Sequence, residues 1–221
     1  RWARTEIVRR SLRVVPIECV VFDLGNVLVE WDRRRLYEKL IDDPVDLDRF
    51  LDEVLTLDIN ADLDRGVPLA EVTAALVARH PAHVELIDAF RDRWAETLGE
   101  IIDGSVAILE DLASTDVQLL ALSNWGRDTF LTAEPHLPFL RHFHALVISG
   151  REGVVKPDPA IFELLCERHA VTPGRAVVID DSQANVDAAY ALGFQTVLFA
   201  TPEQCRRELV ELGLDLVEQA P

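Results

Sequence analysis

Long apolar segments are missing from this sequence of 221 residues, whose longest uninterrupted apolar runs have only the length of a strand. A membrane-spanning helix needs roughly 20 consecutive apolar residues, so the sequence predicts no membrane span. Basic residues are also scarce, because 22 Lys and Arg accompany 39 Asp and Glu and give a formal net charge of -17. Such a negative field repels phosphate backbones and anionic lipid surfaces. We therefore expect no nucleic-acid partner and no membrane partner.

Cysteine is rare as well. Cys19, Cys166 and Cys205 are an odd number and lack the spacing of metal ligands, which is typical of reduced thiols in the cytoplasm. The first 13 residues contain five arginines, but Glu6 and the shortness of the segment argue against a transit peptide. We therefore expect a cytoplasmic protein in which residues 1–16 are an N-terminal extension without chemistry.

Hydrophobic residues make up 49% of the chain, which is enough for a sizeable core. Short aliphatic runs alternate with segments of helical periodicity. This alternation predicts an α/β fold with a mostly parallel sheet covered on both faces. The predicted strands are 18–23, 117–122, 176–180 and 195–199, with a weaker one at 143–148, and the predicted helices include 105–113, 159–169 and 184–192.

Residues 33–102 differ from the rest of the chain, because they contain no strand-like run and show helical periodicity interrupted by proline and glycine. Within 82–99, apolar residues recur at spacings of three and four and define one face of a helix. We therefore predict an all-helical insertion between the first strand and the second. The residues of that apolar face are Val84, Ile87, Phe90, Trp94 and Leu98.

The segment VVFDLGNVLVEWD, residues 20–32, places a carboxylate, Asp23, at the end of a run that otherwise reads as buried. Taken alone, the segment also fits a hairpin in which Asp23 begins a turn and residues 27–29 form the second arm. In a parallel sheet, however, the active crevice lies beyond the carboxyl ends of the strands. The residues that follow the other predicted strands therefore decide between the two interpretations.

Acidic side chains stand at the carboxyl ends of two predicted strands, Asp23 at the end of 18–23 and Asp180 at the end of 176–180, with Asp181 directly after it. Three carboxylates at one edge of a sheet repel one another unless a cation lies among them, and hard divalent cations prefer oxygen ligands. Magnesium uses one or two carboxylates and keeps several waters, which matches Asp23 and Asp181 with Asp180 in support. The sequence therefore predicts a Mg²⁺ site.

Groups that suit a phosphate dianion occur at the same edge. Ser123 and Asn124 follow the second strand and can donate hydrogen bonds, and Lys156 precedes a predicted helix and can supply a positive charge. Each of these residues by itself has an ordinary structural explanation, such as a surface lysine or the start of a loop. Their joint occurrence with the carboxylates, in this order, favours a phosphate site.

Four segments resemble, in order, the four motifs of the haloacid dehalogenase superfamily, and they extend over most of the chain from about residue 17 to 200. The resemblance implies a Rossmann-like core formed by residues 17–32 and 103–221, with residues 33–102 as a helical cap. The fourth segment is especially specific. The four segments are VVFDLGNVLV, LLALSNWG, GVVKPDPAIF and VVIDDSQANVDAAYALGF.

The same resemblance implies a role for each site residue. Asp23 would be the nucleophile that forms an aspartyl-phosphate, Ser123 would bind phosphate, and Lys156 would steady both the nucleophile and the phosphoryl group. A carboxylate can attack an anionic ester once magnesium and lysine offset the repulsion. The implied magnesium ligands are Asp23, the backbone carbonyl of Gly25 and Asp181, with Asp180 beside them.

Phosphatases of this superfamily usually carry a second Asp two residues after the nucleophile, where it protonates the leaving oxygen, but this chain has Gly25 there. General acid catalysis is typically worth about a hundred- to ten-thousandfold. The FDLGNV form nevertheless resembles a subset that includes a sugar 1-phosphate phosphatase. Two alternatives stay open, a 2-haloacid dehalogenase that uses Asp23 without metal, and a non-catalytic phosphoester-binding or regulatory protein.

We therefore predict a magnesium-dependent phosphomonoester hydrolase, monomeric or homodimeric, that acts on a small phosphorylated metabolite. Four residues close in sequence to the motifs are candidates to line its pocket, and one of them, Asp32, is a candidate source of the missing proton. These four residues are Trp31, Asp32, Trp125 and Arg127.

Overall fold

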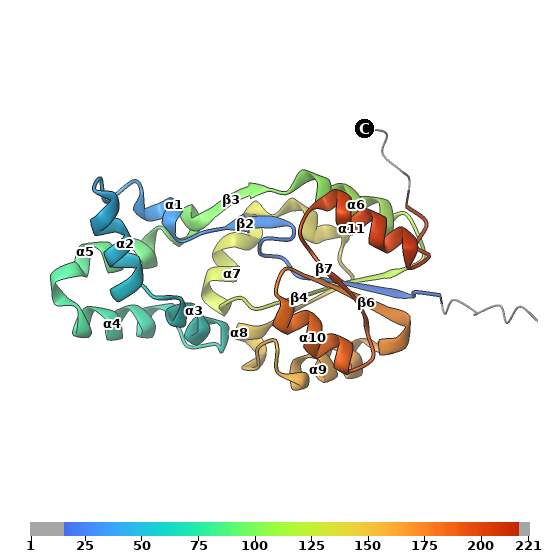
Figure 1. Cartoon of the computed structure of the whole chain (residues 1–221). Helices are drawn as coiled ribbons and strands as arrows, with labels where there is room; N and C mark the ends of the chain where they lie inside the picture. Colours follow the sequence, from blue (N-terminus) through green and yellow to red (C-terminus); the bar gives the residue numbers. More distant parts are fainter. Residues whose placement is uncertain (1–15, 217–221) are drawn as a thin grey trace, which may run out of the picture.

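The structure, a computed structural model, describes residues 16–216. Its centre is a sheet of five parallel strands in the order β5-β4-β1-β6-β7 (Figure 1). The predicted α/β class is confirmed, and every predicted strand is present with ends that differ from the expected ones by no more than two residues. The strands are β1 (Cys19–Phe22), β4 (Gln118–Ser123), β5 (Ala145–Ile148), β6 (Ala176–Asp180) and β7 (Gln195–Leu198).

The central strand of the sheet is β1, which pairs in parallel with β4 on one side and β6 on the other. Phe22 lies opposite Ala121 of β4 and Ile179 of β6. The hairpin interpretation of residues 20–32 is therefore wrong, because both edges of β1 are already paired. The chain segments that follow β4, β1 and β6 consequently leave the sheet side by side at one edge.

Helices cover both faces of the sheet, and alternate strand residues face different cores. Val20 and Phe22 belong to a core with α6 and α11, whereas Cys19 and Val21 face α9 and α10. Figure 1 shows these two helix pairs on opposite sides of the sheet. The helices of this part are α6 (Asp103–Ala113), α7 (Arg127–Ala133), α8 (Ser149–Glu152), α9 (Pro159–His169), α10 (Gln183–Ala191) and α11 (Pro202–Glu211), with short 3-10 turns at Glu134–His136, Pro138–His142 and Pro173–Arg175.

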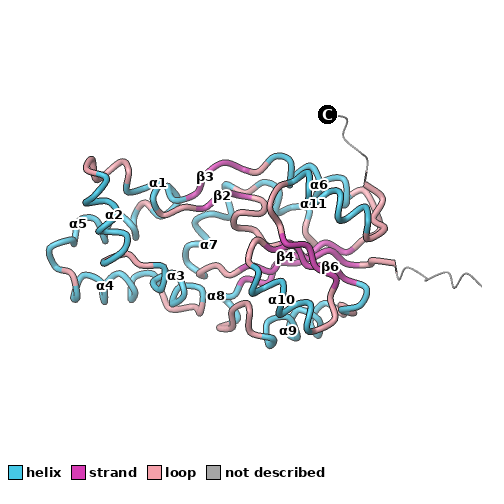
Figure 2. The backbone as a smooth tube through the Cα atoms, in the orientation of Figure 1, coloured by secondary structure: helices cyan, strands magenta, loops and turns pink. Residues whose placement is uncertain are grey.

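A group of helices, here called the helical insertion (residues 34–97), lies at one end of the sheet (Figure 2). Its aromatic residues pack internally, and Tyr37 and Phe50 have ring centroids 4.7 Å apart. The insertion shares its apolar core with the α6 side of the sheet. Its helices are α1 (Arg34–Tyr37), α2 (Pro44–Glu53), α3 (Leu57–Asp64), α4 (Leu69–Arg79) and α5 (Val84–Asp92), with 3-10 turns at Pro81–His83 and Trp94–Thr97.

The prediction that residues 33–102 contain no strand is wrong at the C-terminal end of that range. Leu98–Ile101 form β3, which pairs antiparallel with β2 (Val29–Trp31) and so makes a ribbon between the sheet and the insertion. Of the predicted helical face, Ile87 and Phe90 are buried on α5, and Trp94 is buried in the 3-10 turn that follows it, whereas Val84 is exposed. Leu98 continues that spacing, but Gly99 disfavours a helix and the pairing with β2 gives the segment another partner.

Both ends of the chain lie outside the described residues, so the predicted extension at residues 1–16 is described only at Pro16. Within residues 16–216, no helix has the length and apolar character that a membrane crossing requires. The three cysteines are not joined in disulfides. Burial raises the pKa of Cys19 and of Cys205 to about 12, so both behave as apolar core residues.

Candidate active site

Asp23 lies where the chain leaves the central strand. Its backbone N–H still donates to the Ile179 carbonyl oxygen at 2.9 Å, so the sheet continues to this residue. The Leu24 N–H donates to Asp23 Oδ1 at 2.7 Å. The Leu28 N–H then bonds to the Leu24 carbonyl oxygen at 2.8 Å and closes a tight turn. The carboxylate is therefore fixed by the sheet on one side and by the turn on the other.

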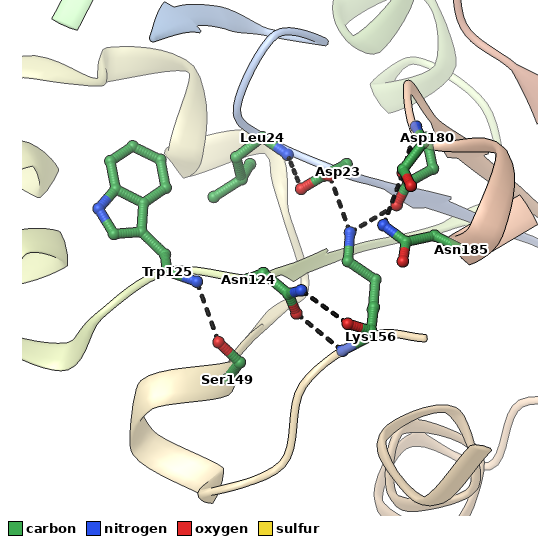
Figure 3. A network of polar contacts seen from close by, with 9 residues as sticks. Asp23, Leu24, Asn124, Trp125, Ser149, Lys156, Asp180 and Asn185 are labelled. Carbon is green, nitrogen blue, oxygen red and sulfur yellow. Dashed lines mark hydrogen bonds and ion pairs between the residues drawn. The ribbon is translucent and has the colours of Figure 1, made fainter. Parts of the chain in front are cut away.

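Lys156 joins two of the predicted carboxylates (Figure 3). Its Nζ atom lies 2.8 Å from Asp23 Oδ2 and 2.5 Å from Asp180 Oδ2, and the side chain is almost fully buried. Three groups from three separate segments, the ends of β1 and β6 and the loop between α8 and α9, thus meet as the sequence predicts. The ammonium group is held between two carboxylates, which restricts its position strongly.

Asn124 has a contact that the sequence did not suggest. Its Nδ2 donates to the Lys156 carbonyl oxygen at 2.9 Å, and its Oδ1 accepts from the Lys156 backbone N–H at 2.8 Å (Figure 3). Both polar atoms of the side chain are therefore used to hold the backbone of Lys156. The amide that we expected to donate to phosphate is instead seen to position the lysine.

Asp180 is completely buried and its two oxygens are engaged. Oδ2 accepts from Lys156, and Oδ1 accepts from the Ser182 backbone N–H and from Asn185 Nδ2, both at 2.9 Å. Asp181, the next residue, is exposed. One carboxylate oxygen from each of Asp23, Asp180 and Asp181 lies within 4.8 Å of the others. Asp180 thus holds the lysine, while Asp181 lies exposed at the surface of the site, where its carboxylate accepts a hydrogen bond from the Asn26 side chain.

Burial and repulsion from neighbouring carboxylates raise the pKa values of Asp23 and Asp181. Desolvation raises the pKa of Asp23 to about 6 and Asp180 adds to this, although Lys156 and a hydrogen bond from Ser123 oppose the rise. Desolvation and Asp180 also raise the pKa of Asp181. Burial alone would lower the pKa of Lys156, but the two carboxylates outweigh it and raise the value. One ammonium group is thus insufficient for three carboxylates, and a cation would stabilise their ionised forms.

A cavity of about 410 Å³ opens above these groups. Trp31 and Trp125 line it, as the sequence suggested. Asp32 and Arg127 do not: Asp32 accepts a hydrogen bond from the Arg34 backbone N–H at the start of α1, and Arg127 pairs with Asp128. The suggestion that Asp32 supplies a proton is therefore wrong. The wall on the side of the helical insertion is formed by Asn60, Leu63, Asp64 and Trp94.

Gly25 borders the cavity, and the backbone conformation does not require glycine at this position. Its φ is not in the left-handed region, and a Cβ added there would meet no atom within 4 Å. The next residue, Asn26, does have a positive φ of 56°, and its Oδ1 accepts from the Trp31 backbone N–H at 3.0 Å. The space that a side chain at position 25 would occupy is therefore open to the cavity.

Several residues of the site were missed from the sequence. Asn185, four residues after Asp181 on the first turn of α10, had a usable signal, because a polar side chain there faces back to the strand end. Ser149 Oγ accepts from the Trp125 backbone N–H at 3.0 Å and had no such signal. Asn60 and Asp64 belong to α3, which lies far in sequence from the motif residues, and only the packing of this helix brings them to the cavity.

Comparison with known proteins agrees with this geometry. The haloacid dehalogenase-like hydrolase family matches residues 17–193. A D-ribitol-5-phosphate phosphatase of Bacteroides thetaiotaomicron is 24% identical over 200 residues, which cover 87% of this chain and 97% of that protein. Other curated relatives are much longer, and the chain spans only 8% and 14% of two of them.

Two solved structures have similar folds. One is an enzyme of the haloacid dehalogenase (HAD) family from Bacteroides thetaiotaomicron, in complex with magnesium and inorganic phosphate. Its TM-score is 0.67 at 22% identity, and the match covers 84% of this chain and 95% of that one. The other is the L-2-haloacid dehalogenase of Xanthobacter autotrophicus with chloropropionic acid covalently bound, with a TM-score of 0.59, 19% identity and coverage of 88% and 83%. At these identities the likeness concerns the fold alone.

Proposed function

The chain belongs to the haloacid dehalogenase-like hydrolases, and we propose that it hydrolyses a small phosphomonoester with the help of magnesium, through a phosphoaspartate on Asp23. The observation that carries this proposal is the position of Lys156 Nζ, 2.8 Å from Asp23 and 2.5 Å from Asp180, with Asp181 beside them. Asp23 is thus a buried carboxylate held in one orientation, and the three carboxylates beside the cavity offer more oxygen atoms than one ammonium group can neutralise.

Asp23 is the group best placed to attack phosphorus. It ends the central strand, lines the cavity and is held by Leu24 and Lys156. Covalent attack divides hydrolysis into two displacements, in which Asp23 first takes the phosphoryl group and water then removes it. Lys156 orients the carboxylate and offers positive charge to the phosphoryl oxygens. The hydroxyl of Ser123 lies against Asp23 and is proposed to donate to the same oxygens.

The donor set suits magnesium. Asp23 and Asp181 offer carboxylate oxygens within 4.8 Å of each other, and hard oxygen ligands are those that Mg²⁺ prefers. Asp180 also lies within this group, but its two oxygens already accept three hydrogen bonds. We propose Asp23, Asp181 and the Gly25 carbonyl as ligands, with Asp180 in support. The bound ion would offset the negative charge of the carboxylates and of the phosphate dianion.

The helical insertion is proposed to act as a cap that limits access to Asp23. Its wall of the cavity is formed by Asn60, Leu63, Asp64 and Trp94, and a cavity of this size beneath a cap suits a metabolite better than a phosphorylated protein. Phosphatase relatives act on D-ribitol 5-phosphate or on phosphorylated carbohydrates. Phosphorylated polyols and sugars are therefore the first substrates to test.

Phosphate release from a panel of phosphorylated polyols, sugars and aryl esters tests the proposal when it is measured with Mg²⁺ and with EDTA. We expect turnover with Mg²⁺, its loss in EDTA and its recovery on addition of excess Mg²⁺. Halide release from 2-chloropropionate, unaffected by EDTA, would favour the dehalogenase alternative instead. Binding of phosphate without turnover of any ester would favour the non-catalytic alternative.

A further inference from the structure

The cavity contains few groups that could hand a proton to a leaving group. Gly25 has none to give, and Asp32 points elsewhere. Among the described residues that line the cavity, the carboxyl groups are those of Asp23, Asp64 and Asp181. In the proposed function Asp23 is the nucleophile and Asp181 a magnesium ligand. Asp64, the last residue of α3 in the helical insertion, has no assignment.

Close contacts hold the end of α3 against the sheet domain. A Cβ added at Gly66, which has a φ of +93°, would lie 2.8 Å from the Gly150 carbonyl oxygen, so the two backbones nearly touch there. A Cβ added at Gly126 would lie 2.9 Å from the Cβ of Leu63. Figure 2 shows α3 beside α8, and the two helices are in contact. Asp64 and Arg65 lie between these two contacts, so the position of Asp64 over the cavity is fixed.

One hydrogen bond completes this attachment. The Leu69 backbone N–H, at the start of α4, donates to Asp128 Oδ2 at the start of α7 at 3.0 Å. The loop from α3 to α4 is therefore anchored to the loop that follows β4 and to α8. A flexible cap would leave the distance between Asp64 and Asp23 undefined, whereas this anchored loop sets it.

The surroundings of Asp64 favour its protonated form. The carboxyl group is partly buried, it lies at the negative end of a helix, and no described residue donates a hydrogen bond to it or pairs with it. Desolvation, with a smaller effect of Asp23, raises its pKa to about 7, while Lys156 and Arg65 act in the opposite direction. The other charged residues on helices in contact with α3 are Glu71, Arg79, Arg151 and Glu152.

On these contacts, and provided that the proposed function holds, we infer that Asp64 is the general acid that protonates the leaving oxygen. As an Asp23 oxygen bonds to phosphorus and the ester P–O bond breaks, the Asp64 proton passes to the departing oxygen and an alcohol leaves. The Asp64 carboxylate then takes a proton from the water that attacks phosphorus. The bond between phosphorus and Asp23 breaks, which releases phosphate and restores both side chains.

Asp64→Asn tests this assignment, because the amide has the same shape and has no acidic proton. The measured quantity is kcat/KM, since it reports the step in which the alcohol leaves. The substrates are 4-nitrophenyl phosphate, whose leaving group needs no proton, and benzyl phosphate, whose leaving group does. Asp62→Asn, on the same helix but exposed, is the matched control. Asp64→Glu keeps the acid and serves as the second variant.

We expect Asp64→Asn to lower kcat/KM for benzyl phosphate by about a hundredfold or more, with little change for 4-nitrophenyl phosphate and none for Asp62→Asn. For benzyl phosphate, wild-type kcat/KM should fall at alkaline pH as the Asp64 carboxyl group loses its proton. This fall should disappear in Asp64→Asn and remain in Asp64→Glu. Equal losses for both esters, or no loss for either, would overturn the assignment. A wild-type enzyme that hydrolyses neither ester but releases halide would contradict the proposed function itself, and the assignment with it.

Discussion

The two walls of the cavity are built differently. On the sheet side, Asp23, Lys156 and Asp180 are each held by at least two hydrogen bonds or ion pairs within the domain. On the side of the helical insertion, the carboxyl group of Asp64 has no hydrogen-bond partner among the described residues. In the proposed mechanism, this difference means that the sheet side orients the nucleophile, whereas the insertion supplies groups that meet the rest of the substrate.

The way in which each wall is positioned differs as well. Adjacent parallel strands bring the sheet residues together, so their placement follows directly from the fold. The insertion residues depend on close backbone contacts at Gly66 and Gly126. Changes on the sheet side should therefore abolish chemistry, whereas changes on the insertion side should alter which substrates react.

The largest effect is expected at Asp23. Asp23→Asn should keep the fold, because the amide still accepts the Leu24 N–H, but it removes the proposed nucleophile and should lower turnover on the order of ten-thousandfold or more. Steady-state phosphate release measures the loss, and circular dichroism verifies the fold. Asp116→Asn, an exposed change just before β4 and so at the opposite edge of the sheet, is the control. Normal turnover by a folded Asp23→Asn protein would refute the mechanism.

The neighbouring residues Asp180 and Asp181 should separate stability from metal binding. Asp180→Asn leaves buried Lys156 with one carboxylate fewer, so we expect the free energy of unfolding to fall by about 3–5 kcal/mol. Asp181→Asn removes an exposed carboxylate whose pKa is raised by desolvation and Asp180, and should leave stability unchanged or slightly higher.

Urea unfolding in EDTA measures the stability of both variants, and calorimetric titration with Mg²⁺ measures their metal affinity. We expect only Asp181→Asn to bind Mg²⁺ much more weakly while it remains fully folded. Similar destabilisation by the two substitutions would show that Asp180 has no special structural function beside Lys156.

On the insertion side, Asp64 should make stability depend on pH. Its pKa is raised from 3.8 to about 7, so the folded state holds a proton that the unfolded chain loses at lower pH. Ionising the folded carboxyl group is therefore unfavourable, and the penalty grows as the pH rises from about 4 to about 7 and is constant above that.

Asp64→Asn removes the penalty. Relative to wild type, the variant should be equally stable near pH 4 and more stable by about 2–3 kcal/mol near pH 8. Urea unfolding of the metal-free proteins at several pH values measures this difference. A difference that does not vary with pH would mean that Asp64 ionises as an ordinary exposed carboxyl group does.

The sheet side of the site was largely predictable from the sequence. Parallel strands place their carboxyl ends at one edge, so Asp23, Ser123 and Asp180 could be expected to converge once the strands were recognised. What could not be read was the use of each side chain. Whether Asn124 bonds to phosphate or to the backbone of Lys156 depends on the path of a loop more than 30 residues away.

The insertion side was not predictable in the same way. Helical periodicity indicates which face of α5 is buried, yet it does not say which residue of α3 reaches the cavity. Asp64 is one of several acidic residues in residues 58–64, and nothing in the local pattern distinguishes it from Asp62. The contacts of Gly66 and Gly126 that select it join segments about 60–85 residues apart in sequence. Such contacts follow from tertiary packing, which single-sequence patterns do not encode.

The smallest effect is expected when the proposed acid is moved from the insertion to the sheet side, by adding a carboxyl group at position 25 and removing the one at position 64. This experiment is also the sharpest test of the difference between the two walls. Gly25→Asp is sterically possible, because the φ of Gly25 is outside the left-handed region and an added Cβ would meet nothing within 4 Å. In the Asp64→Asn background, the new carboxyl group borders the same cavity and should restore benzyl phosphate hydrolysis by about tenfold. In the wild-type background, where Asp64 already donates the proton, the same substitution should bring no gain. Comparison of kcat/KM for benzyl and 4-nitrophenyl phosphate in the four proteins measures this. An equal gain in both backgrounds would mean that the wild-type enzyme lacks an effective acid, and that Asp64 does not compensate for Gly25.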